Sequence, residues 1–283
     1  MSQHYERRLR RVIDHIHDHP TGDLSLDVLA DVAAMSRFHF HRIWRAMTGE
    51  TAAQTVRRMR MHRAAVDLVT TTRPLAEIAP AVGYPDVTSF ARAFAELYGT
   101  PPAAFRRAGA LRPAFILTQP TQTQPKGKDM DVAIRTEPAR RLAAIPHRGS
   151  YHEIGRAFET LFATLSARGM LAGSDPVMIG VYYDDPQSVP AADLKSHAGI
   201  AVAEDAVIEA PLEEVRLTGG RYAVSLHKGP YAELPAAWDA LYSGWLRTSS
   251  EVPANAPGIE IYLNTPMAVA QAELLTELCV PLA

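Results

Sequence analysis

One carboxylate near the C-terminus stands in a segment that is otherwise apolar. Glu260 lies between Ile259 and Ile261, and Tyr262 and Leu263 follow. Successive side chains of a strand point to opposite faces, so Glu260 shares a face with Tyr262 and not with the isoleucines. Burying a lone carboxylate is costly, so it meets solvent, finds a partner or accepts a cation. Two interpretations stay open: an exposed strand residue, or the acidic group of a binding site.

Aromatic residues surround Glu260 in the expected arrangement, and ring faces attract cations. We expect a cationic small molecule to be bound by Glu260, Tyr262, Trp238, Trp245, Tyr231, Tyr151 and Tyr182. The same glutamate, with a raised pKa in a dry groove, could serve as a general acid or base with a tyrosine assisting. We predict a binding site without a metal or cofactor, and keep an enzyme as the alternative.

The segment that carries these residues is written twice, eighty residues apart. HRGSY (147–151) matches HKGPY (227–231), and IGVYYDDP (179–186) matches IEIYLNTP (259–266). Each copy is typical of a strand, a glycine turn, an amphipathic helix (about 152–168 and 232–247) and two further strands. Two copies side by side would leave a groove along their seam, where small-molecule pockets tend to lie. Gly180 in the first copy corresponds to Glu260 in the second.

A different chemistry is indicated in the N-terminal part, where two helix-turn-helix patterns follow one another. LADVAAM (29–35) matches IAPAVGY (78–84), and FHRIW (40–44) matches FARAF (90–94). The second helix of such a unit enters the major groove of DNA, and its outward residues contact base edges. The residues predicted to project in this way are Arg37, Phe38, His41 and Arg42 in one unit and Val87, Thr88, Ala91 and Arg92 in the other. A helix over 51–69, free of Gly and Pro, is expected between the units.

The charge distribution agrees with two parts that face different partners. Residues 1–113 carry 16 Arg, no Lys and 11 acidic residues, whereas the remainder has a net charge of −7. Arginine suits phosphates and guanine edges, although an ordinary solvated surface could show the same excess. A Pro-, Gln- and Thr-rich segment predicts a linker at 113–129. The charged N-terminus and the lack of a long apolar run predict a cytoplasmic protein, and the single cysteine, Cys279, is expected in the core.

Two stretches resemble known families. IAPAVGYPDVTSFARAFAELYGTPPAAFRR (78–107) is similar to the AraC/XylS family of transcriptional regulators, and the resemblance covers about residues 8–107. GIEIYLNTP (258–266) and the segments 181–202 and 217–246 resemble the GyrI-like effector-binding domain over residues 130–283. That resemblance implies that Glu260 contacts cationic, lipophilic compounds. It also implies that some relatives hydrolyse small lipophilic molecules with the same glutamate and a tyrosine.

The sequence therefore predicts a multi-domain α + α/β chain. Residues 1–112 form an all-α DNA-binding domain with two helix-turn-helix units, and residues 130–283 form an α+β domain built from a duplicated strand-helix-strand-strand segment. The predicted function is a transcriptional regulator that binds promoter DNA and a small-molecule effector, with RNA polymerase as a further partner. The alternatives are a hydrolase acting on small lipophilic compounds, or a protein-binding module, fused to a DNA-binding domain.

Overall fold

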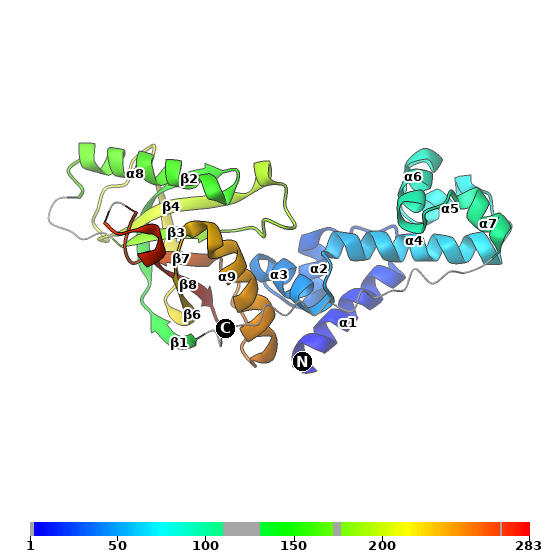
Figure 1. Cartoon of the computed structure of the whole chain (residues 1–283), viewed down its shortest axis with the longest axis horizontal. Helices are drawn as coiled ribbons and strands as arrows, with labels where there is room; N and C mark the ends of the chain where they lie inside the picture. Colours follow the sequence, from blue (N-terminus) through cyan, green and yellow to red (C-terminus); the bar gives the residue numbers. More distant parts are fainter. Residues whose placement is uncertain (1–2, 110–130, 172–176, 267) are drawn as a thin grey trace. The chain divides into compact units, whose positions relative to one another are not determined.

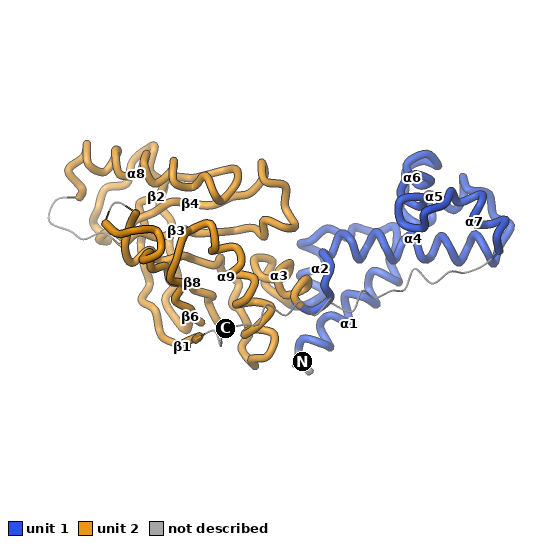
Figure 2. The backbone as a smooth tube through the Cα atoms, viewed as in Figure 1, with its two compact units in different colours: residues 1, 3–34, 47–125 blue, residues 2, 35–46, 126–283 orange. Residues whose placement is uncertain are grey.

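The computed structural model describes residues 3–109, 131–171, 177–266 and 268–283 (Figure 1). These residues form two compact units (Figure 2). The first unit comprises residues 3–34 and 47–109, and the second comprises residues 35–46 and the described residues from 131 onward. The predicted linker at 113–129 lies outside the described residues. Residues 35–46, which were expected to belong with the N-terminal helices, are part of the second unit.

The first unit is helical. Its helices are α1 (Gln3–Asp18), α2 (Leu26–Ala33), α4 (Ala52–Thr70), α5 (Leu75–Ala81), α6 (Val87–Tyr98) and α7 (Pro102–Ala108). Helix α4 is the long helix expected between the two patterns, and it begins with a reciprocal cap. The Thr51 hydroxyl accepts from the backbone N–H of Gln54 at 3.2 Å, and the Gln54 side chain accepts from the backbone N–H of Thr51 at 2.8 Å.

Helices α5 and α6 form the second helix-turn-helix, and they are held by packing against α4 and α7. The buried side chains of this cluster include Met61, Leu68, Ile78, Phe90, Phe94 and Phe105. Asp86 caps the start of α6 by accepting from the backbone N–H of Ser89 at 2.8 Å. Gly99 ends α6 in the left-handed region at φ 69°, which glycine adopts readily. The outward face of α6 is therefore carried on a rigid support.

The second unit is built on one eight-stranded antiparallel sheet in the described residues. The strands are β1 (Val132–Glu137), β2 (Arg140–Arg148), β3 (Met178–Tyr182), β4 (Lys195–Val202), β5 (Glu213–Leu217), β6 (Gly220–Lys228), β7 (Gly258–Tyr262) and β8 (Leu275–Pro281). Their order across the sheet is β1-β6-β8-β7-β3-β4-β2-β5. Each strand of the first half has a counterpart about eighty residues later: β1 and β5, β2 and β6, β3 and β7, β4 and β8. When every strand is exchanged for its counterpart, the same order results, read from the opposite edge. The two edge strands, β1 and β5, each pair with a strand from the other half.

The two halves meet where β3 pairs with β7. In this register Met178 lies opposite Tyr262, Gly180 opposite Glu260, and Tyr182 opposite Gly258. An exchange of residues eighty positions apart leaves these pairings unchanged. Gly180 and Glu260 therefore stand at the centre of this seam between β3 and β7.

Helical segments pack against one face of the sheet. They are η1 (Tyr151–Glu153), α8 (Gly155–Ala167), η3 (Tyr231–Glu233), α9 (Leu234–Ala240) and the π-helical η4 (Leu241–Leu246); η2 (Ala191–Asp193) and η5 (Gln271–Glu273) are short turns before β4 and β8. Helix α3 (Arg37–Thr48) also contributes residues 37–46 to this unit.

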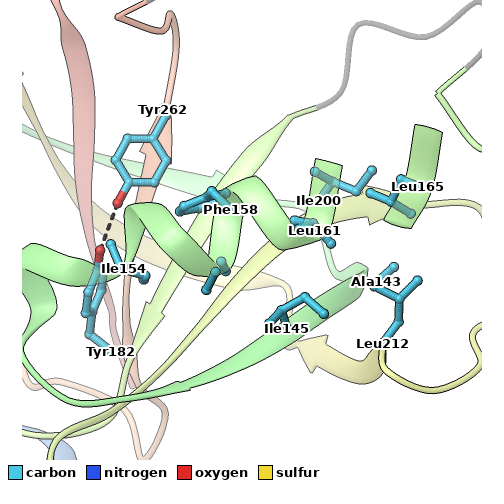
Figure 3. Close-up of a cluster of buried hydrophobic side chains, with 12 residues drawn as sticks. Ala143, Ile145, Ile154, Phe158, Leu161, Leu165, Tyr182, Ile200, Leu212 and Tyr262 are labelled. Atoms are coloured by element: carbon cyan, nitrogen blue, oxygen red, sulfur yellow. Dashed lines mark hydrogen bonds between the residues drawn. The ribbon is translucent and has the colours of Figure 1, made fainter. Parts of the chain in front are cut away.

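Alternation along the strands divides the buried residues between the two faces. Ala143, Phe158, Leu161, Tyr182 and Tyr262 belong to the cluster shown in Figure 3. The opposite face buries a second cluster that includes Leu142, Ile179, Val181, Ile259, Ile261 and Cys279. The expected separation of Ile259 and Ile261 from the face that carries Tyr262 is confirmed, and Cys279 is a core residue as expected.

Candidate functional site

Glu260 is a buried residue at the seam, with 4% of its surface exposed. Its two carboxylate oxygens accept separate hydrogen bonds: the indole N–H of Trp238 donates to Oε1 at 2.7 Å, and the hydroxyl of Tyr262 donates to Oε2 at 2.7 Å. The hydroxyl oxygens of Tyr182 and Tyr262 are 2.8 Å apart (Figure 3). Since Tyr262 gives its proton to Glu260, Tyr182 donates to Tyr262. The interpretation of Glu260 as an exposed strand residue is therefore wrong.

Burial dominates the electrostatics of this cluster. It raises the pKa of Glu260, while the hydrogen bonds from Trp238 and Tyr262 oppose the increase. Burial, followed by the Glu260 charge, also raises the pKa of Tyr182 and Tyr262 well above the ordinary tyrosine value. The tyrosines are therefore held as neutral hydrogen-bond donors. Glu260 is an acid whose charged form would gain from a nearby cation.

The glycine opposite Glu260 makes room for this cluster. A Cβ atom at Gly180 would lie 2.8 Å from Cε2 and 2.9 Å from the hydroxyl of Tyr182, and 3.0 Å from the hydroxyl of Tyr262. Real Cβ atoms do not approach other atoms so closely, so any larger residue would displace the tyrosines. The lack of a side chain at Gly180 therefore leaves the space that the two tyrosine rings occupy beside Glu260.

The other predicted aromatic residues are divided between this cluster and its surroundings. The ring of Tyr151 stands edge-on to that of Tyr182 at 4.8 Å, and the ring of Tyr231 lies 5.4 Å from that of Tyr262. Both are half-buried. Trp245 is half-exposed on η4, and the hydrogen bond to the carboxylate comes from Trp238 instead.

Two aromatic residues join the cluster without having been predicted. Phe158 packs edge-on against Tyr262 at 5.4 Å, and the Tyr242 ring lies 6.0 Å from that of Trp238. The signal that could have found them is the repeat itself. Phe158 occupies the position that corresponds to Trp238, and Phe162 corresponds to Tyr242.

Helix α6 presents its predicted residues in two degrees of exposure. Thr88 and Arg92 are exposed, whereas Val87 and Ala91 are half-buried. The Arg92 guanidinium is 3.4 Å from Glu96, which also pairs with Arg57 of α4. A shallow hollow of about 460 Å³ lies here, lined by Arg57, Asp86, Thr88, Ser89, Arg92, Ala93 and Glu96. This surface offers hydroxyl and guanidinium donors of the kind that contact bases and phosphates.

Helix α3 presents its predicted residues differently. Arg37 is exposed and Phe38 is half-buried, but His41 and Arg42 retain only 9% and 8% of their exposure. The Arg42 guanidinium lies 4.8 Å from the centre of the Trp238 ring and 5.1 Å from that of Tyr242. In this arrangement one of the predicted DNA-contacting arginines is covered by the rings beside Glu260.

Two further residues of α3, His39 and Arg45, also contact residues near Trp238. The His39 ring nitrogen and the Tyr242 hydroxyl are 2.5 Å apart, and Arg45 forms an ion pair with Asp239. Burial, followed by the Arg42 charge, lowers the pKa of His39 to about 3, so the imidazole is neutral. A hollow of about 260 Å³ opens beside these contacts, lined by Arg42, Arg45, Ala46, Gln187, Asp239, Tyr242 and Ser243.

Within the described residues, no helix is long and apolar enough to cross a membrane. No group of three or more His, Cys, Asp or Glu side chains is placed to hold a metal ion in the same part of the chain. His15 and His19 of α1 stack on one another with their ring centres 4.5 Å apart.

Comparison with known proteins assigns both parts of the chain. Residues 130–283 match the model of the GyrI-like small molecule binding domain, and residues 29–108 match that of a helix-turn-helix domain. The DNA gyrase inhibitor of Salmonella typhimurium is 31% identical over 143 residues, which are 49% of this chain and 90% of that protein. The regulatory protein SoxS of Salmonella typhimurium is 30% identical over 102 residues, which are 36% of this chain and 95% of that protein.

A third relative matches this chain over only part of its own length. The uncharacterized HTH-type transcriptional regulator YbfP of Bacillus subtilis is 31% identical over 103 residues, which are 36% of this chain and 35% of that protein. The chain thus spans about a third of that regulator. Among solved structures, the C-terminal domain of EcmrR is 16% identical, covers 54% of this chain and 98% of that domain, and has a TM-score of 0.45.

Proposed function

Because this chain belongs to the GyrI-like family of small-molecule-binding domains, and its N-terminal part to the SoxS-like AraC-type regulators, we propose that it regulates transcription in response to a lipophilic cation. The observation that carries the ligand class is the buried carboxylate of Glu260, whose hydrogen-bond donors are the neutral groups of Trp238 and Tyr262. A cation among these rings would balance the charge of the carboxylate, and apolar groups on the cation suit the aromatic walls.

We also propose that the seam between β3 and β7, which carries this site, arose by duplication of one segment. Support comes from the strand order, which is unchanged by an exchange of residues eighty positions apart, and from the register of β3 on β7. A duplicated segment creates one central position at the seam. If both equivalent residues there were carboxylates, their like charges would repel one another. The pairing of Gly180 with Glu260 avoids this repulsion.

The DNA-binding role is proposed for the second helix of each helix-turn-helix unit. On α6 the exposed residues Thr88 and Arg92 are the strongest candidates for base and phosphate contacts, with Val87 and Ala91 beside them. On α3 the candidates are Arg37, Phe38, His41 and Arg42. Promoter DNA and RNA polymerase are the macromolecular partners, and this role requires the cytoplasmic location that the composition predicts.

A calorimetric titration of the full chain with tetraphenylphosphonium tests the ligand class. Wild type is expected to bind this cation saturably, and to bind the neutral triphenylphosphine oxide much more weakly. Glu260→Gln is expected to lose most of the affinity for the cation. Glu277→Gln serves as the matched control, because Glu277 pairs with Arg135 at the edge of the sheet and the substitution removes the same charge.

The other outcomes point to the alternative functions. Equal affinity of wild type and Glu260→Gln for the cation would refute the role of the carboxylate. The raised pKa of Glu260 beside Tyr262 is the observation behind the hydrolase alternative. To test it, the protein is incubated with a lipophilic ester and the mixture is separated by chromatography. Loss of the ester with wild type but not with Glu260→Gln would identify an enzyme.

A further inference from the structure

A cationic side chain of the protein itself already lies against the proposed ligand site. The Arg42 guanidinium is 4.8 Å from the centre of the Trp238 ring, and the N–H of the same indole donates to Glu260 at 2.7 Å. Trp238 thus has a cation over its face and the carboxylate at its edge. Tyr242 offers Arg42 a second ring face at 5.1 Å. These are the groups that a lipophilic cation would use.

The charge of Arg42 acts on the groups of the site. Burial is the main cause of the raised pKa of Glu260, and the Arg42 charge acts against that increase. The same is true of Tyr151 and Tyr242, where burial raises the pKa and Arg42 opposes it. Arg42 thus stabilises an ionised Glu260 in the way an external cation would.

Arg42 cannot serve DNA while it holds this position. With 8% of its surface exposed and its guanidinium over the faces of two rings, it offers little of that group to a guanine base or a phosphate. His39 and Arg45 fasten the same helix through Tyr242 and Asp239. The contact is nevertheless at the surface, because Arg42 and Tyr242 line the hollow of about 260 Å³.

We propose that Arg42 is a built-in competitor for the effector: its guanidinium occupies the cation site beside Trp238, and a lipophilic cation that takes this place releases α3 for DNA. This inference rests on the proposed function of the Glu260 site. In this scheme the effector binds the state with Arg42 withdrawn, and its apparent affinity is reduced by the fraction of molecules in which Arg42 stays in place. The coupling between ligand and DNA then depends on Arg42, which can contact either the aromatic rings or DNA, but not both.

The first test measures tetraphenylphosphonium affinity of the full chain by calorimetry for wild type and Arg42→Ala. Loss of the competitor is expected to tighten binding by about tenfold, on the scale of one partly desolvated cation–π contact. Arg216→Ala is the matched control, since it removes one arginine from the exposed edge strand β5 and should leave the affinity unchanged. Equal or weaker binding by Arg42→Ala would overturn the proposal.

The second test uses amide hydrogen exchange of the peptides that cover α3. Tetraphenylphosphonium added to wild type is expected to speed exchange in α3, and Arg42→Ala is expected to do so without the cation. Unchanged α3 exchange in both experiments would also overturn the proposal.

The two tests distinguish this proposal from the proposed function. If neither wild type nor Arg42→Ala binds the cation, the proposed function fails, and exchange in Arg42→Ala still decides whether Arg42 fastens α3. If wild type binds and Glu260→Gln does not, the proposed function stands whatever the result for Arg42.

Discussion

At the scale of single residues, Glu260 is a group whose ionisation opposes folding. Its pKa is raised, chiefly by burial, so the folded protein holds the proton more tightly than the unfolded chain. Stability therefore falls as the pH rises from the ordinary glutamate pKa through the raised one. We expect Glu260→Gln to melt at a higher temperature than wild type, with a difference that grows as the pH rises above about 4.5, the ordinary glutamate pKa. Thermal melts across this range check the prediction, and a difference independent of pH would contradict it.

Gly180 is expected to be intolerant of even one added carbon. A Cβ atom there would lie 2.8–3.0 Å from atoms of Tyr182 and Tyr262, so Gly180→Ala must displace the tyrosine pair. We expect a loss of about 1–3 kcal/mol in the free energy of unfolding, typical of overpacked cores. Urea denaturation measures it. Gly244→Ala is the control, because no atom lies within 4 Å of a Cβ placed there, and a loss as large in the control would remove the steric explanation.

The sequence predicted part of this site and left the rest open for physical reasons. Alternation along the strand placed Glu260 on the face of Tyr262, because that depends only on local geometry. Its burial could not be predicted, since a helix that covers a strand is brought there by contacts distant in the sequence. For the same reason the sequence could not choose between Trp238 and Trp245 as the partner of the carboxylate.

At the scale of elements, α6 offers the most direct test of DNA contact. Arg92 is exposed, and its ion pair with Glu96 at 3.4 Å is at the surface, where such pairs contribute little. We expect Arg92→Ala to weaken binding to a duplex selected from a random library by about 1–3 kcal/mol, and binding to unselected DNA much less. Arg10→Ala, on the exposed face of α1, is the control in fluorescence anisotropy. An equal loss on both DNAs would restrict Arg92 to phosphate contacts.

The attachment of α3 should depend on pH through His39. This residue contacts Tyr242 of η4 and lies near Arg42 of its own helix, and burial lowers its pKa to about 3. An unfolded histidine titrates near 6.5, so the neutral imidazole contributes stability above that pH, and the contribution is lost as the pH falls toward about 3. We expect amide exchange in α3, corrected for intrinsic rates, to accelerate as the pH falls from about 7 to about 4.5. His39→Gln should flatten this dependence, and an unaltered slope in the variant would contradict the assignment.

Element boundaries were predictable where the signal is local. The long helix over 51–69 depends on propensity and caps, and α4 has these limits to within a residue. The helix expected over 232–247 is instead divided into η3, α9 and the π-helical η4. A π turn adds a residue to the helix, and Tyr242, whose hydroxyl contacts His39, lies within this segment. Hydrophobic periodicity does not reveal such a turn.

At the scale of the whole molecule, linkage makes the proposed competition reciprocal. If a lipophilic cation strengthens DNA binding by displacing Arg42, then DNA must strengthen binding of the cation by the same factor. We expect saturating tetraphenylphosphonium to raise affinity for the selected duplex, and saturating duplex to raise affinity for the cation equally. Titrations at one fixed salt concentration are needed, because phosphate contacts make the affinity for DNA fall steeply with salt.

Arg42→Ala is expected to bring this coupling factor close to one, because the side chain that both partners compete for is gone. Arg92→Ala should weaken DNA binding and leave the factor unchanged, since Arg92 lies on α6 and pairs there with Glu96 of its own helix. The two variants separate a residue that transmits the signal from one that only reads DNA. A factor unchanged in Arg42→Ala would place the coupling elsewhere in the chain.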